Sequence, residues 1–118
     1  MMHWERAEIG KDYDIYLVDG QKAKQYPTDT GPLDILAISK DKTHLLVVEL
    51  KQGRASDAVV GQILRYMSFV QDEVAEPGQE VRGMIIAHED DARIRRALSM
   101  TSNISFCRYE VSFKLKMG

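Results

Sequence analysis

The chain has 118 residues, 44% hydrophobic and 29% charged, with a formal net charge of −2 at pH 7, which is typical of a single globular domain over residues 1–118. This charge excludes a general electrostatic attraction to nucleic acid, so any such contact must depend on local clusters of arginine and lysine. The lone Cys107 excludes an internal disulfide, and no apolar run reaches the roughly 20 residues that span a bilayer, so we expect a cytoplasmic protein without a membrane partner.

The first half of the chain predicts four strands. Alternating apolar and polar residues, rich in β-branched and aromatic side chains, favour strands over residues 13–18, 24–26, 33–39 and 44–51. Asp19-Gly20 is a turn signal after the first strand, and we expect a loop from Pro27 to Pro32. The polar residues 40–43 predict a turn that joins the last two strands into a hairpin.

The second half predicts helices that alternate with strands. Apolar residues recur at helical spacing after Ser56, a favoured N-cap, and Pro77-Gly78 ends this helix at about Glu76. A second helix is expected over residues 89–100, where acidic residues precede arginines as the helix dipole favours. Further strands are expected over residues 82–87, 104–109 and 111–116. This order predicts an α/β domain with a mixed central β-sheet flanked by helices.

Three charged residues stand at the ends of the hairpin strands. Asp34 opens one apolar strand, and Glu49 and Lys51 close the next. Strand side chains alternate between faces, so Glu49 and Lys51 project from the same side, and the two strand ends are adjacent in an antiparallel hairpin. Charges are rarely buried without partners, so this strand end is a candidate site for a divalent cation. A loop-ending Asp34 beside a simple Glu49–Lys51 ion pair is the alternative interpretation.

These three charges form a D…ExK pattern, and the residues around them resemble a known family. The segments Val47-Val-Glu-Leu-Lys-Gln-Gly-Arg-Ala55 and Gln62-Ile-Leu-Arg-Tyr66 resemble the nuclease domain of the NucS-type endonucleases, in the PD-(D/E)xK or restriction-endonuclease-like superfamily. A wider resemblance, from about Ile9 onward, is to small stand-alone bacterial relatives. The resemblance implies a restriction-endonuclease-like fold.

The resemblance also implies divalent-metal-dependent, endonuclease-like hydrolysis of phosphodiester bonds in DNA. Asp34, Glu49 and the backbone carbonyl of Leu50 would hold Mg²⁺ or Mn²⁺, because these ions prefer hard oxygen ligands. Lys51 would orient the attacking water or stabilise the charge that develops on the phosphate. Gln62 would help to position the water or the phosphate.

The implied nucleic-acid contacts are Arg54, Arg65 and Tyr66. The two arginines would bind phosphates. Tyr66 shares a helix face with Gln62 at i, i+4 spacing, and would pack beneath it or contact the nucleic-acid backbone. Solvated surface is the alternative for the arginines, and ordinary helix packing is the alternative for Gln62 and Tyr66.

One departure from the family leaves other functions open. Related domains begin with a longer helix that brings an acidic residue to the metal site, whereas few residues precede the first expected strand here, leaving Glu5 or Glu8 as stand-ins. The alternative to an enzyme is therefore a catalytically inactive nuclease-fold module that binds nucleic acid or a protein partner. A third interpretation is a structural domain whose final strand pairs with another chain. We also expect a homodimer, since a small domain without a separate DNA-binding region gains from dimerising.

Overall fold

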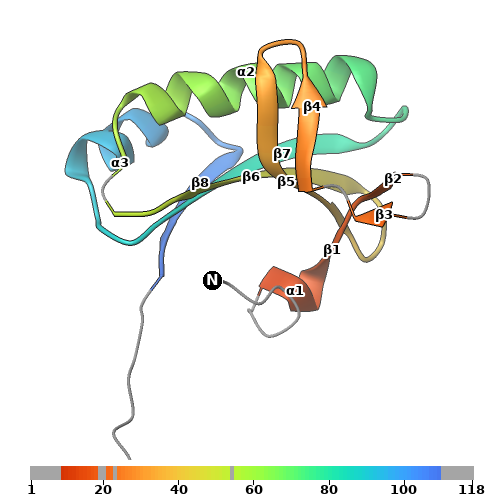
Figure 1. The fold of residues 1–118 in the computed structure, drawn as a ribbon, viewed down its shortest axis with the longest axis horizontal. Helices are drawn as coiled ribbons and strands as arrows, with labels where there is room; N and C mark the ends of the chain where they lie inside the picture. The colour runs from red at the N-terminus through yellow and green to blue at the C-terminus, as the bar shows by residue number, and fades with distance from the viewer. Residues whose placement is uncertain (1–8, 19–20, 23, 54, 110–118) are drawn as a thin grey trace, which may run out of the picture.

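A computed structural model describes residues 9–18, 21–22, 24–53 and 55–109 of the protein. Its elements in chain order are α1 (Ile9–Asp12), β1 (Tyr13–Ile15), β2 (Leu17–Val18), β3 (Gln21–Lys22), β4 (Lys24–Thr28), β5 (Gly31–Ser39), β6 (His44–Lys51), α2 (Ala58–Glu73), β7 (Glu80–Ala87), α3 (Ala92–Leu98) and β8 (Ile104–Arg108). Six strands form one mixed sheet in the order β1-β5-β6-β7-β8, with β4 also paired to β5. Figure 1 shows α2 and α3 over one face of this sheet and the short α1 below the other. The predicted α/β fold with a mixed central sheet is confirmed.

The strand ends that carry the candidate site meet at one edge of the sheet. β5 and β6 form an antiparallel hairpin whose pairing extends as far as Ile35 with Val48. β6, β7 and β8 run parallel, because the helices α2 and α3 return the chain to the same edge between them. Lys51 therefore lies beside Ala87 at the carboxyl ends of the parallel strands.

Most of the hydrophobic core lies between the sheet and α2. The buried face of α2 consists of Val59, Ile63, Tyr66, Met67 and Val70. A Cβ on Gly83 of β7 would lie 2.7 Å from Met67 Sδ and 3.0 Å from Ile63 Cδ1, so glycine lets the helix approach the strand closely. This packing holds the first turns of α2 over the end of β6.

The opposite face of the sheet carries a second cluster of buried apolar side chains. It consists of Ile15, Ile35, Ala37, Leu46, Val48 and Ile86. β6 is thus apolar on both faces, as a central strand requires, with Leu45 and Val47 in the α2-side core instead. Continued alternation places Glu49 and Lys51 on the same face, as predicted, and the structure shows that this is the face that α2 covers.

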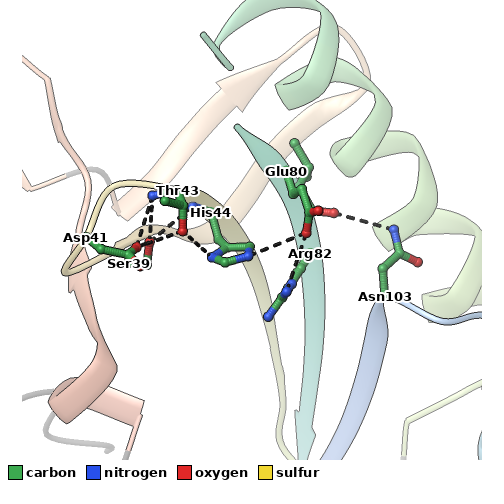
Figure 2. A network of polar contacts seen from close by, with 8 residues as sticks. Ser39, Asp41, Thr43, His44, Glu80, Arg82 and Asn103 are labelled. Carbon is green, nitrogen blue, oxygen red and sulfur yellow. Dashed lines mark hydrogen bonds and ion pairs between the residues drawn. The ribbon is translucent and has the colours of Figure 1, made fainter. Parts of the chain in front are cut away.

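The turn between β5 and β6 is held by side chains at the end of the hairpin far from Lys51 (Figure 2). Ser39 Oγ donates to Asp41 Oδ1 at 2.7 Å and accepts the backbone N–H groups of Thr43 and His44. Thr43 donates to Asp41 through both its N–H and its hydroxyl. These hydrogen bonds, that from Ser39 foremost, lower the pKa of Asp41 to about 2. Ser39 thereby uses its one hydrogen-bond donor and both of its acceptor positions within the turn. The network therefore fixes the register of the hairpin, and it does not activate Ser39 as a nucleophile.

The ring of His44 links this turn to the next strand. Its Nδ1 lies 2.7 Å from the Thr43 hydroxyl, and its Nε2 lies 3.4 Å from Glu80 Oε2 (Figure 2). Arg82 reaches the same Glu80 oxygen at 3.4 Å. The first residues of β6 and β7 are therefore tied together through side chains as well as through the ladder.

The strand expected over residues 13–18 was wrong in extent. It is divided into β1 and β2, because Leu17 and Val18 pair with Lys22 and Gln21 in a separate two-stranded ladder. Of β1 and β2, only β1 pairs with β5.

The loop expected from Pro27 to Pro32 was also wrong. These two prolines face each other in the β4–β5 hairpin, and only Asp29 and Thr30 lie outside its strands. Proline is tolerated because β4 is an edge strand and Pro32 precedes Ile35, where the pairing of β5 with β6 ends.

The helix boundaries differ from the predicted ones. Ser56 is not the N-cap: Asp57 occupies that position, and the carbonyl of Ser56 instead accepts the N–H of Val59 in a tighter turn before α2. α3 is shorter than residues 89–100 because Asp91 caps it, accepting the N–H groups of Arg93 and Ile94. The strand expected over residues 111–116 lies outside the described residues. Of the helices within the described ranges, none is long and apolar enough to cross a membrane.

Candidate active site

Asp34 lies where β5 diverges from β6, and both of its carboxylate oxygens are held. Oδ2 accepts the backbone N–H of Leu50 at 2.8 Å, and Oδ1 accepts the side-chain amide of Gln25 at 3.1 Å. The backbone N–H of Asp34 in turn donates to Glu49 Oε1 at 3.3 Å. The hairpin therefore brings the two carboxylates together although they are fifteen residues apart in the chain.

Glu49 is a buried acid at the end of β6, with only 2% of the residue exposed. Burial, and then the negative charge of Asp34, raise the pKa of Glu49 from 4.5 to about 7. Lys51 Nζ lies 4.0 Å from Glu49 Oε2 and offsets this shift only in part. Within the described part of the chain, the positive charge near Glu49 is therefore too small to offset the effects of burial and of Asp34 on its pKa.

A chain of hydrogen bonds runs from Lys51 into α2. Lys51 Nζ donates to Gln62 Oε1 at 3.4 Å, and Gln62 Nε2 donates to the Tyr66 hydroxyl at 3.0 Å. The structure therefore brings Gln62 to the strand end that carries Glu49, and Gln62 and Tyr66 share one helix face, as their i, i+4 spacing predicted.

Tyr66 is placed beneath Gln62 and away from solvent, with 3% of the residue exposed. A Cβ on Gly31, at the start of β5, would lie 3.6 Å from the Tyr66 hydroxyl, so the β4–β5 hairpin lies against α2 here (Figure 1). Of the two roles considered for Tyr66, this burial fits packing below Gln62 and does not fit a direct contact with nucleic acid.

The remaining candidate residues are Arg65, Arg54 and Leu50. Arg65 is exposed on α2, and Arg54, like Glu5 and Glu8, lies outside the described residues. Leu50 gives its N–H to Asp34. Because the N–H and C=O of one strand residue face the same neighbouring strand, the Leu50 carbonyl is also directed to the Asp34 side.

Gln25 was missed in the sequence. It lies in a short strand whose residues carry no motif, and its spacing from Asp34 has no helical or strand period that would mark it. Only the pairing of β4 with β5 brings its amide to Asp34.

The donor set at this strand end fits a small, hard divalent cation. Among the residues that the structure describes, no group of three or more His, Cys, Asp or Glu side chains could hold a metal ion. The possible ligands are therefore the carboxylates of Asp34 and Glu49 and the main-chain carbonyl of Leu50. Such a small set suits Mg²⁺, which is commonly bound by one or two carboxylates together with water and substrate phosphate. The raised pKa of Glu49 agrees with such a site, because a cation would relieve the repulsion between the acids.

Comparisons with known proteins give the same family as the sequence motifs. The family model described as Endonuclease NucS C-terminal domain matches residues 15–117. The crystal structure of a repair endonuclease from Pyrococcus abyssi aligns with a TM-score of 0.62 and 26% identity, covering 74% of this chain and 36% of that chain. A structure of an EndoMS–dsDNA complex aligns with a TM-score of 0.65 and 21% identity, covering 87% of this chain and 38% of that chain. The chain thus spans little more than a third of these proteins. It belongs to the family of NucS endonuclease C-terminal domains and has their restriction-endonuclease-like nuclease fold.

Proposed function

We propose that this domain hydrolyses phosphodiester bonds of DNA with the aid of Mg²⁺ or Mn²⁺. The observation that carries the proposal is the pair Asp34 and Glu49, in which a buried acid with a pKa of about 7 lies beside a second carboxylate and 4.0 Å from Lys51. Strongly shifted acids paired with a specific cationic side chain are characteristic of active sites.

Asp34, Glu49 and the Leu50 carbonyl would hold the cation. When bound, the cation supplies charge neutralisation on the phosphate and lowers the pKa of water. The geometry favours this assignment because both acids and the Leu50 backbone converge on one strand end.

Lys51 supplies a fixed positive charge next to these ligands. Gln62 accepts a hydrogen bond from the Lys51 ammonium group and donates one to the buried Tyr66 hydroxyl. These three residues would form one hydrogen-bonded arm that directs the charge of Lys51 toward the phosphate. A charge fixed before the reaction stabilises the transition state without reorganising at the moment of reaction.

DNA would follow the surface beside this arm. Arg65 lies three positions after Gln62 on α2, is exposed, and would contact a phosphate, as would Arg54. The complex of EndoMS with double-stranded DNA supports duplex DNA as the first substrate to test. A homodimer stays a prediction.

The test is cleavage of end-labelled single- and double-stranded DNA by the purified protein in Mn²⁺, in Mg²⁺ and in EDTA. We expect cleavage that needs the ion, is lost in Glu49→Gln, and is retained in Asp72→Asn, a matched change of an exposed acid on α2. Cleavage by Glu49→Gln equal to the unmodified protein would overturn the site. Retained DNA binding without cleavage would favour the non-catalytic module.

A further inference from the structure

The strand that carries Gln25 is distorted at this residue. The ladder pairs Lys24 with Ile35 and Tyr26 with Leu33, so Gln25 lies opposite Asp34. Gln25 has a φ of 54°, in the left-handed region that side-chain-bearing residues rarely adopt. Such backbone conformations persist only where the surrounding structure imposes them, and they cluster at functional sites.

Gln25 and Leu50 hold Asp34 from two sides. The Gln25 amide donates to Oδ1 at 3.1 Å from β4, while the Leu50 N–H donates to Oδ2 at 2.8 Å from β6. A carboxylate has about four lone-pair positions, so each oxygen keeps one for a cation. The two donors together prevent rotation of the carboxylate about its terminal bond, which a single donor does not.

We infer that Gln25 is a positioning residue for the metal site: it holds the Asp34 carboxylate in the orientation in which that group and Glu49 share one divalent cation. The inference rests on the proposed function. It gives the distorted β4 strand a role in the site, although Gln25 itself touches neither the cation nor the DNA. Partners that orient a ligand in this way commonly change metal affinity by about 10- to 100-fold when removed.

Two variants separate the hydrogen bond from the backbone conformation. Gln25→Met keeps the length of the side chain and the left-handed backbone but removes the donor, whereas Gln25→Gly removes the donor and also suits a φ of 54°. Lys42→Gly is the matched control, because Lys42 has a φ of 63° in the turn at the far end of the hairpin.

The first measurement is Mn²⁺ affinity by titration calorimetry. We expect both Gln25 variants to bind Mn²⁺ about 10-fold more weakly, and Lys42→Gly to bind it like the unmodified protein. Cleavage by the Gln25 variants should recover towards the normal rate as Mn²⁺ is raised. Gln25→Met with unchanged affinity would overturn the inference, and a loss confined to Gln25→Gly would assign the effect to the backbone instead.

The second measurement needs neither metal nor activity. The Leu50 amide hydrogen is bound by Asp34, so freeing Asp34 in Gln25→Met should speed its hydrogen exchange several-fold in NMR spectra of the metal-free protein, with no change in Lys42→Gly. Unchanged Leu50 exchange would contradict the positioning role. Faster exchange in a protein that binds no Mn²⁺ would overturn the proposed function and leave the Gln25–Asp34 contact standing.

Discussion

The backbone N–H of Asp34 donates to the carboxylate of Glu49 at 3.3 Å, so one acid of the candidate site is held by the main chain of the other. The contact forms just beyond the last ladder pair of β5 and β6, where β5 diverges and frees its N–H for a side chain. The position of Glu49 is therefore coupled to the hairpin itself, whose register is held by the Ser39–Asp41–Thr43 turn at its other end.

The buried Glu49 should make the stability of the metal-free protein depend on pH. Its pKa is about 7 in the folded protein and 4.5 ordinarily, so between these values the folded state keeps a proton that the unfolded chain has lost. Protonation of Glu49 therefore stabilises the folded state fully below pH 4.5, and this stabilisation is lost as the pH rises through 7. The free energy of unfolding should fall by on the order of 1–3 kcal/mol over this range. Urea unfolding at pH 5 and pH 8 should show this loss, and Glu49→Gln should reduce it while Glu73→Gln should not. Mn²⁺ affinity should rise over the same range, because the ion binds the deprotonated acid.

Asp34, Glu49 and Lys51 should behave as one catalytic unit. Asp34→Asn, Glu49→Gln and Lys51→Met are each expected to lower cleavage by at least about 100-fold, and the triple variant little further, because each change disables the same step. Thermal unfolding in EDTA should show the two carboxylate variants as stable as the unmodified protein or more so, since repulsion is relieved. Losses that multiply across the variants would show that the three residues act independently.

Tyr66→Phe should weaken catalysis while sparing the metal site. The change removes the hydroxyl that accepts the Gln62 amide, so Gln62 and Lys51 lose their fixed orientation. We expect kcat to fall about three- to tenfold at saturating Mn²⁺, the range of one hydrogen bond, with the Mn²⁺ dissociation constant unchanged. Tyr16→Phe is the control, because Tyr16 lines a cavity with Lys42 and Thr43 near the turn at the other end of the β5–β6 hairpin. A changed Mn²⁺ affinity with normal kcat would contradict this role for Tyr66.

Two glycine substitutions should change stability in opposite directions. Gly83→Ala places a Cβ 2.7 Å from Met67 Sδ and should lower the free energy of unfolding by about 1–3 kcal/mol through overpacking. Gly61→Ala, within α2, places its Cβ at an ordinary 3.5 Å from Arg65 Nη1 and should raise it by about 0.5–1 kcal/mol. Urea unfolding of both variants tests this. Equal stability of Gly83→Ala would mean that α2 moves away from β7 at little cost.

The mixed α/β sheet and much of the candidate site were predictable from local pattern. Side chains alternate along a strand whatever surrounds it, so Glu49 and Lys51 had to share a face of β6. The hairpin placed Asp34 near them, and helical spacing placed Gln62 and Tyr66 on one face of α2. The family motifs rest on these same short spacings, so the sequence carries them independently of the tertiary structure.

The tertiary structure alone decided what depends on packing between distant segments. The pKa of Glu49 follows from its burial in the folded protein and from the charge of Asp34, and Tyr66 is likewise buried beneath Gln62. Gln25 reaches Asp34 only through the register of β4 on β5, where two prolines had predicted a loop. Strand pairing and burial are set by contacts between residues far apart in the chain, and local propensity in strands yields to that context.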